Sequence, residues 1–401
     1  MSVLKIRDTY LWNILSKNKY LRKILDIKIL RYTFDFFLPS ESYQGIPVNI
    51  GVEGLFKKLK EQQINYVVLR NFENLPNHHF NSDIDFLVAD YDYIKLLRLI
   101  TRKPSKGLIP IDINIVYTCK EKIIGIPLYQ QKIGFDLLDS SYFNEKGIKI
   151  PKHSLYFWSY LYHTVISKGL KSKIQSSVLK TTTFLEKDGQ NKYLSKLKQL
   201  STSIETVPEI TSNTTLEYLF SILEKSPYLP NQDTLFKFSH KNLWLESFLV
   251  VKENIGSINL PIGLIIFFVR SANFDQVNNI KEVIENFTKN KTLFFNLNKS
   301  QINTCSKKIR GSNWSDNDGG LPSHIIITKM NIQNDLEYIK NSKKIKEFLR
   351  SNKKFSRTLL CNTSQVVHSS DNNLLAFHYL KILKFNENKI REFISILNSE
   401  E

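Results

Sequence analysis

The stretch NSDIDFLVAD, residues 81–90, decides the fold of the first half of the chain. Its acid, apolar and acid residues Asp83, Ile84 and Asp85 suit a strand with both carboxylates on one face and the isoleucine on the other. NYVVLRNF (65–72) precedes it and LIPIDINIVY (108–117) follows it, and both are predicted strands. Predicted helices over 51–64 and 91–102 alternate with these strands. The alternation indicates an α/β or α+β unit.

A third acid, Asp112, lies inside IDINIV between apolar residues. Asp83 and Asp85 repel each other at so short a spacing, so they are stable together chiefly where a cation neutralises them. A site of carboxylate oxygens that also binds phosphates is typical of Mg²⁺ or Mn²⁺. We therefore predict that the three acids are metal ligands and catalytic residues. The alternative is that Asp83 and Asp85 merely end a strand in solvent and that Asp112 pairs with a lysine.

The pattern over residues 47–150 resembles the DNA polymerase β-like nucleotidyltransferase superfamily. In that superfamily a strand and a Gly-Ser turn precede a strand with two alternating acids, and a third acid follows. The resemblance implies a mixed sheet and a metal-dependent transfer from a phosphorylated or nucleotide-activated donor. Arg70 and Asn71 replace the Gly-Ser pair that holds the triphosphate, and we expect them to bind the donor phosphates, Arg70 as a bidentate donor.

This departure makes glycosyl or phosphoribosyl transfer an alternative to nucleotidyl or phosphoryl transfer. Nucleotidyltransferase-like proteins of bacterial polysaccharide clusters show similar departures. The resemblance to that group implies a role in surface polysaccharide assembly, with a lipid-linked glycan as the acceptor.

The rest of the chain is expected to form a helical region and a second domain. Residues 129–151 are predicted to be a small appended β region, and residues 154–200 are predicted to be helical. In the latter, His163 is a candidate base that faces the substrate. The predicted domains are a basic helical segment (1–46), the nucleotidyltransferase-like domain (47–150), a helical region with a linker (151–234) and a second α/β domain (235–401).

The segment QVVHSSDNNLLAFHYL, residues 365–380, is the second one that suggests chemistry. Val366 and Val367 are predicted to end a strand, His368 follows them, and SSDNN can cap a helix that starts near Leu374. The imidazole would then lie beside a helix N-terminus, where anions are favoured.

This segment weakly resembles the active-site segment His-Gly-Ser-Asp of nucleoside-diphosphate kinases. His368, Ser370 and Asp371 match, whereas Gln365 replaces an asparagine and Tyr379 replaces the acid that orients the histidine. The resemblance implies a ferredoxin-like α/β domain that binds phosphate or nucleotide. The residues that it implies as anion contacts are His368, Arg270, Arg310 and Arg357. His368 is either catalytic or structural; the structural alternative is an accessory domain in which it caps a helix.

The net charge and the length of the apolar runs limit which partners the protein can bind and where in the cell it can lie. The 401 residues hold 56 Lys and Arg against 38 Asp and Glu, so that the net charge of +18 attracts anions. Residues 1–39 hold eight Lys and Arg against three Asp, and are predicted to form basic amphipathic helices that lie on a membrane surface or dock on the protein itself. The longest apolar run, 260–269, is too short to span a membrane. We expect a cytoplasmic protein, soluble or peripheral at the inner membrane face.

These observations together predict an enzyme, a metal-dependent transferase that uses a nucleotide- or pyrophosphate-activated donor. An alternative of another class is a non-catalytic protein that binds nucleotide or nucleic acid. A nucleic-acid partner is supported by charge alone, and we do not expect one.

Overall fold

The computed structural model describes most of the chain from residue 44 onward. The described residues are 44–77, 83–101, 107–116, 129, 131–185, 189–239, 241–255, 263–309, 314, 319–331, 341–349 without 343 and 347, and 366–398. The predicted basic helices over 1–39 lie outside these residues. The chain divides into two compact units, of which the first comprises Met1–Thr118 and Pro127–Tyr160 and the second comprises Cys119–Ile126 and Leu161–Glu401. Each is described by itself.

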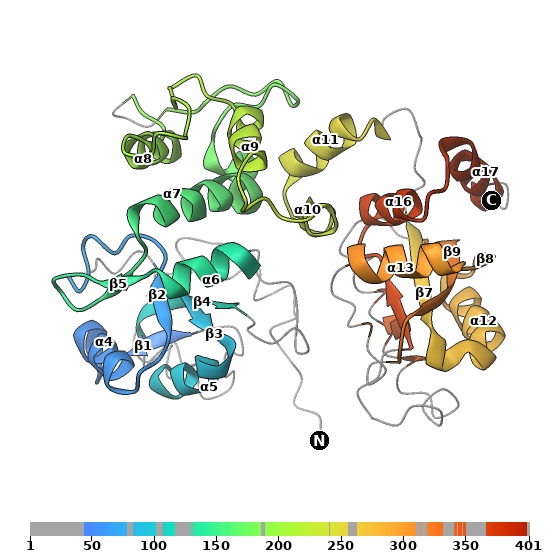
Figure 1. Ribbon diagram of the computed structural model, residues 1–401, viewed down its shortest axis with the longest axis horizontal. Coiled ribbons are helices and arrows are strands. Elements are labelled where there is room, and N and C mark those ends of the chain that lie inside the picture. The colour runs from blue at the N-terminus through green and yellow to red at the C-terminus, as the bar shows by residue number, and fades with distance from the viewer. Residues whose placement is uncertain are drawn as a thin grey trace, which may run out of the picture. The chain divides into compact units, whose positions relative to one another are not determined.

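The first unit is built on a four-stranded sheet with helices on both faces (Figure 1). Its described strands are β1 (Gly45–Pro47), β2 (Tyr66–Val68), β3 (Ile84–Ala89) and β4 (Gly107–Val116), followed by a small hairpin of β5 (Tyr142–Phe143) and β6 (Lys149–Ile150). Its described helices are α4 (Gly51–Glu61), α5 (Asp90–Leu99), α6 (Gln131–Asp139) and α7 (His153–Tyr162), whose last two residues belong to the second unit.

The sheet of the first unit is mixed. Its order is β1-β4-β3-β2, in which β3 and β4 run parallel and the two outer strands run antiparallel to their neighbours. All residues of β3 are buried, as expected for a central strand covered on both faces. Side chains alternate along it, so that Phe86 packs its ring 6.0 Å from Phe56 of α4, while Asp85 points to the other face.

Residues 131–139 form the helix α6, whereas the small β region predicted over 129–151 begins only at β5. The prediction was wrong for α6, although Ile133 and Leu137 lie one helical turn apart and are buried. Gly134 between them weakens the helical pattern, because glycine is a poor helix former. The fold requires it: a Cβ at Gly134 would lie 2.7 Å from Cγ2 of Val116 in β4. The close approach of α6 to the sheet thus explains the glycine.

The second unit begins with a helical part in which one asparagine joins two segments. Its described helices include a π-helical stretch (His163–Lys168), α8 (Lys192–Ser201), α9 (Leu216–Glu224), α10 (Gln232–Ser239) and α11 (Leu243–Lys252). Asn242 caps α11 by accepting a hydrogen bond from the amide of Leu245. Its Nδ2 donates to the carbonyl oxygens of Val165 and Ile166, at 2.9 and 3.0 Å, and so satisfies two carbonyls of the π-helical stretch.

The second unit continues into an α/β part with an antiparallel sheet. The described strands are β7 (Leu264–Arg270), β8 (Leu293–Asn296), β9 (Pro322–Lys329) and β10 (Val367–Ser369), in the order β10-β7-β9-β8. The described helices are α12 (Val277–Thr288), α13 (Lys299–Lys308), α16 (Asn373–Ile382) and α17 (Glu387–Asn398), and residues 341–349 are helical where they are described. Every neighbouring pair of strands is antiparallel.

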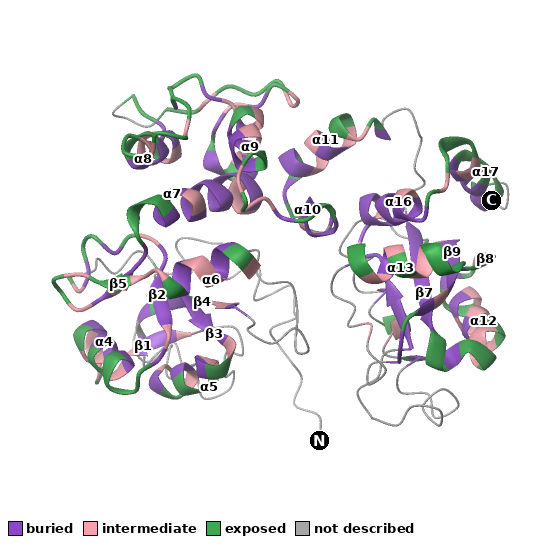
Figure 2. Cartoon of the chain, viewed as in Figure 1, coloured by how far each residue is buried: buried purple, intermediate pink, exposed green. Residues whose placement is uncertain are grey.

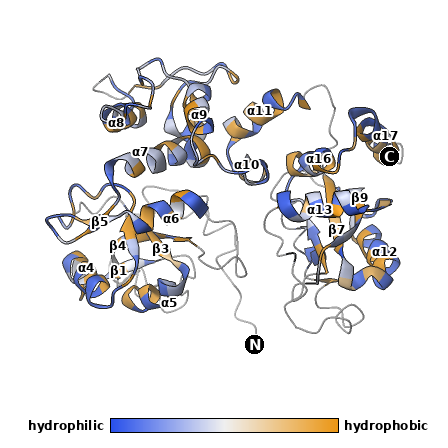
Figure 3. Ribbon diagram, in the orientation of Figure 1, coloured by the Kyte–Doolittle hydropathy of each residue, from blue (hydrophilic) through white to orange (hydrophobic). Residues whose placement is uncertain are grey.

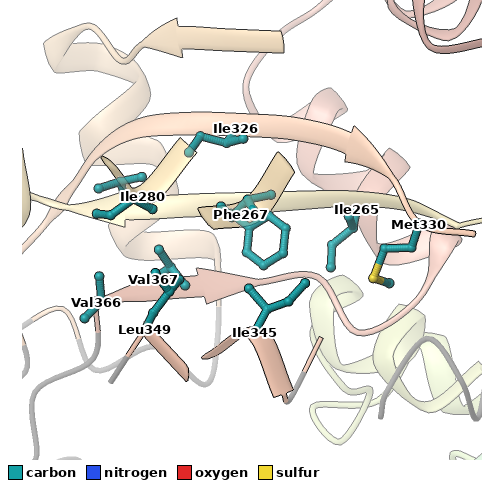
Figure 4. Close-up of a cluster of buried hydrophobic side chains, with 11 residues drawn as sticks. Ile265, Phe267, Ile280, Ile326, Met330, Ile345, Leu349, Val366 and Val367 are labelled. Carbon is teal, nitrogen blue, oxygen red and sulfur yellow. The ribbon is translucent and has the colours of Figure 1, made fainter. Parts of the chain in front are cut away.

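A cluster of buried apolar side chains lies on one face of its sheet (Figure 4). There Phe267 of β7 packs with Ile280 of α12 and with Ile345 and Leu349 of the helical residues 341–349. Strands β7 and β9 are buried along most of their length (Figure 2), and β7 is almost entirely apolar (Figure 3). Both units therefore mix helices with sheets, and the predicted α+β class is confirmed.

Candidate functional site

Three carboxylates come together where β3 and β4 run side by side. The parallel register pairs Asp85 with Asp112, and Asp83 immediately precedes β3. One carboxylate oxygen of each residue lies within 4.8 Å of the others. Asp85 is buried, whereas Asp83 and Asp112 are exposed. The structure thus assembles the three acids that the sequence singles out.

Arg70 forms a two-point ion pair with the buried member of this triad. Its Nη2 lies 2.5 Å from Oδ1 of Asp85, and its Nε donates a hydrogen bond of 3.2 Å to Oδ2. Its Nη1 donates to the hydroxyl oxygen of Tyr129 at 3.3 Å. The side chains of Arg70 and Asp85 are only 10% and 8% exposed. This fork geometry is the strong form of an arginine–carboxylate contact.

The backbone around Arg70 explains why its side chain turns toward the triad. The amide of Leu69 donates to the carbonyl oxygen of Asp85 at 2.9 Å, which places the following arginine beside that acid. Asn71 then adopts φ +57°, a left-handed conformation that asparagine tolerates better than most residues. Its backbone hydrogen-bonds with the hydroxyl of Tyr156, whose ring lies 4.8 Å from that of Phe72. The segment after Arg70 is therefore held by packing.

The electrostatics of the site reflect its crowded negative charge. Asp112 is exposed as a residue, but partial desolvation of its carboxyl group and the charges of Asp83 and Asp85 raise its pKa to about 6. Burial lowers the pKa of Arg70, but the oxygens of Tyr129 and Asp85 raise it by more, so that the guanidinium stays charged. Burial also raises the pKa of Tyr129 to about 12. At neutral pH the site therefore holds a cationic arginine, a neutral phenol and closely spaced carboxyl groups.

The acidic triad could hold a metal ion. Carboxylate oxygens are the ligands of hard divalent cations, and a cation would relieve the repulsion among three carboxylates whose oxygens lie within 4.8 Å of one another. The exposure of Asp83 and Asp112 leaves their oxygens open to solvent, from which a hydrated ion would arrive. Both Mg²⁺ and Mn²⁺ fit such a set of oxygen ligands.

A second cluster lies in the α/β part of the second unit, where His368 and Arg270 both meet Trp314. His368 lies in β10 opposite Phe268 of β7, and its Nε2 is 3.2 Å from the hydroxyl of Tyr379. Arg270, at the end of β7, is fully buried and has its Cζ 4.6 Å from the ring centre of Trp314. The ring centre of His368 lies 5.8 Å from that of Trp314. The two predicted anion contacts thus share one aromatic neighbour.

Two details of the predicted His368 segment are corrected by the structure. The histidine lies within β10 and is buried, rather than following the strand. It does not cap a helix, because Asn372 is the N-cap of α16 and accepts a hydrogen bond of 2.7 Å from the amide of Leu375. Tyr379 stands where the resembling family has an acid that orients the histidine, and its hydroxyl contacts His368 directly.

The other residues predicted from the sequence are not brought into either cluster by the described part of the structure. Arg310 and Arg357 lie outside the described residues. His163 is buried in the π-helical stretch of the second unit. Sequence reasoning missed two residues, Tyr129 and Trp314. Neither belongs to a recognisable motif, and each gains its place only through the fold.

Comparisons with known protein families, with curated proteins and with solved structures found no match to the chain. Within the described part of the chain, every helix is too short or too polar to cross a membrane.

Proposed function

We propose that the first unit contains the active site of a metal-dependent transferase that uses a nucleotide- or pyrophosphate-activated donor. The observation that carries this proposal is the convergence of Asp83, Asp85 and Asp112 at two paired parallel strands, with oxygens within 4.8 Å of one another. Acids at such spacing repel one another. A divalent cation that also binds a phosphate-bearing substrate would neutralise this repulsion and account for the arrangement.

The arrangement of strands supports the families named from the sequence. The mixed sheet, with its two alternating acids in β3 and a third in β4, supports a nucleotidyltransferase-like first unit. In the second unit, the antiparallel order β10-β7-β9-β8 supports a ferredoxin-like fold, since α12 and the helical residues 341–349 pack on one face. That unit, with Arg270 and His368, is proposed to bind phosphate or nucleotide.

The proposed chemistry is a transfer to an acceptor hydroxyl. The acceptor oxygen bonds to the transferred group, the diphosphate leaves with the electron pair of the broken bond, and the acceptor's proton is released. A divalent ion on the triad would supply positive charge to the diphosphate. Asp83 and Asp112 would hold the ion at the solvent side, while Arg70 fixes Asp85.

One observation favours glycosyl or phosphoribosyl transfer as a second candidate. The resembling superfamily holds a nucleoside triphosphate with a Gly-Ser turn, whereas here Arg70 occupies that position and its side chain lies on Asp85. The turn that would cradle a triphosphate is thus altered in both sequence and contacts. We extend the proposal to a lipid-linked glycan acceptor and to polysaccharide assembly at the cytoplasmic membrane face, on the resemblance and the basic segment 1–39 alone.

Thermal shift measurements with candidate donors test the proposal. The donors are nucleoside triphosphates, nucleotide sugars and phosphoribosyl pyrophosphate, each with and without Mn²⁺, on wild type and on Asp83→Asn/Asp112→Asn. A donor at about 100 times its Kd stabilises by about 2.7 kcal/mol, so a shift in melting temperature is measurable. Glu61→Gln is the control, because Glu61 is an exposed acid of α4 in the same unit.

We expect a metal-dependent shift with one donor class that is lost in Asp83→Asn/Asp112→Asn and kept in Glu61→Gln. A metal-independent shift that survives the acid substitutions would support the non-catalytic binding protein instead. No shift with any donor would count against the transferase.

A further inference from the structure

The buried ion pair between Arg70 and Asp85 bears on how many metal ions the triad takes. We infer that Arg70 is the resident cation of the site, so that the triad binds one divalent ion through Asp83 and Asp112 while Asp85 remains bound to Arg70. This inference rests on the proposed metal-dependent function and goes beyond it, since it assigns separate roles to acids that the sequence treats alike.

Contacts hold Arg70 on Asp85 from several sides. Both carboxylate oxygens of Asp85 are engaged, at 2.5 Å by Nη2 and at 3.2 Å by Nε. The third nitrogen, Nη1, donates to Tyr129, which is 2% exposed. To free Asp85 for a metal, the guanidinium would have to leave these partners or share its carboxylate with a second cation. Breaking a buried pair leaves an uncompensated charge, so this rearrangement is costly.

Asp83 and Asp112 differ from Asp85 in their access to solvent. Asp83 and Asp112 are exposed, whereas the side chain of Asp85 is 8% exposed. Mg²⁺ dehydrates reluctantly, keeps several waters and is usually bound through one or two carboxylates together with substrate phosphates. The two exposed acids offer that kind of binding. Asp85 would instead require the ion to enter a space beside a guanidinium.

Charge points to the same number of ions. Three ionised carboxylates carry −3, and Arg70 reduces this to −2, the charge that one divalent ion neutralises. A second ion would leave +2 among groups that lie within a few ångströms of one another, and like charges at this spacing repel strongly where water is scarce. Without Arg70 the triad would return to −3 and could accommodate a second ion, as two-ion sites do.

The test counts bound Mn²⁺ on the full chain. The electron paramagnetic resonance signal of free Mn²⁺ gives the number of ions bound and their affinities. The variants are Arg70→Gln, Arg70→Gln/Asp85→Asn, Asp83→Asn and Asp112→Asn, and Glu61→Gln is the control. The double variant removes both charges of the pair and leaves no buried ion alone, so it remains informative where Arg70→Gln fails to fold.

We expect one Mn²⁺ per wild-type chain at the triad. Asp83→Asn and Asp112→Asn should each weaken it at least about tenfold, since even residues that merely support metal ligands change affinity by such factors. The double variant should keep one ion, because Asp83 and Asp112 still carry the −2 that one divalent ion neutralises, and folded Arg70→Gln should gain a second.

Three results would overturn the inference. Wild type could bind two ions at the triad; the double variant could lose its ion as fully as Asp83→Asn does; or folded Arg70→Gln could still bind just one. Each of these leaves the transferase proposal standing. Absence of any ion from wild type would refute both the one-ion site and the proposed metal dependence.

Discussion

Replacing Arg70 by glutamine should destabilise the first unit in a way that depends on pH and on metal. In the wild type the guanidinium compensates Asp85 inside a triad whose oxygens lie within 4.8 Å of one another. Glutamine keeps a hydrogen-bonding side chain but removes the charge. Asp85 would then be a buried carboxylate beside two further acids.

The magnitude follows from burial and spacing. Removing one partner of a buried ion pair costs about 3–5 kcal/mol of unfolding free energy, and Asp85 is buried enough for that range to apply. Two carboxylate charges at the upper limit of 4.8 Å repel by about 3.5 kcal/mol at an effective dielectric constant near 20. We therefore expect Arg70→Gln to lose about 3–5 kcal/mol at pH 7.5.

Acid should restore much of this loss. In the variant, a triad carboxyl has a pKa in the folded state above its unfolded value, so the folded protein binds more protons and gains stability as the pH falls through that window. Each pH unit within the window is worth at most 1.36 kcal/mol, so lowering the pH from 7.5 to 5 recovers up to about 3.4 kcal/mol. Saturating Mn²⁺ at pH 7.5 should act in the same direction, because it replaces the missing positive charge.

Hydrogen exchange followed by mass spectrometry measures the stability of each unit separately, at each pH and with or without Mn²⁺. Peptides that cover β3 and β4 report the opening free energy of the first unit after correction for intrinsic exchange rates. Peptides that cover β7 in the second unit serve as the internal control. A deficit that is equal at pH 5 and pH 7.5 and unaffected by Mn²⁺ would mean that Arg70 stabilises through packing, and would refute the charge argument.

Three further perturbations should give measurable effects. Mn²⁺ affinity, measured by calorimetric titration from pH 5 to 8, should rise with pH up to about 6 and then level off, since partial desolvation and its two acid neighbours raise the pKa of Asp112 to about 6 and its proton must leave before metal binds. Glu217→Gln should cost about 2 kcal/mol in urea unfolding at pH 7. Burial raises the pKa of Glu217, but hydrogen bonds from Ser176 and Trp244 outweigh this and lower it to about 2, so the wild-type advantage is complete above about 4.5 and fades as the pH falls toward 2. Asn242→Ala should cost about 3 kcal/mol in the same assay, because α11 loses its cap and two buried carbonyls lose their donor.

The sequence was sufficient for the triad because its signals are local. Alternation of acid and apolar residues fixes which side chains share a face of β3, and the apolar neighbours of Asp112 indicate a second buried strand. What it could not supply is the register, which pairs Asp85 with Asp112 rather than with a residue one or two positions away. Register depends on contacts between strands that are distant in the chain.

The errors have physical causes of the same kind. Helix α6 was missed because Gly134 lowers the helical signal of a segment whose glycine serves contact with Val116. His368 was placed after its strand, whereas pairing with Phe268 draws it into β10. In both cases a tertiary contact overrides the local pattern.

Arg70 shows how such contacts decide chemistry as well as fold. The replacement of Gly-Ser by Arg70 and Asn71 is visible in the sequence, and a phosphate contact was the natural expectation. The direction of the side chain is set by the pairing of Leu69 with Asp85 and by Tyr129, far along the chain. Because the arginine lies on Asp85, it changes the charge that any metal or donor meets at the triad from −3 to −2. The number of cations that the acids accept is therefore governed by a residue outside the acidic motif.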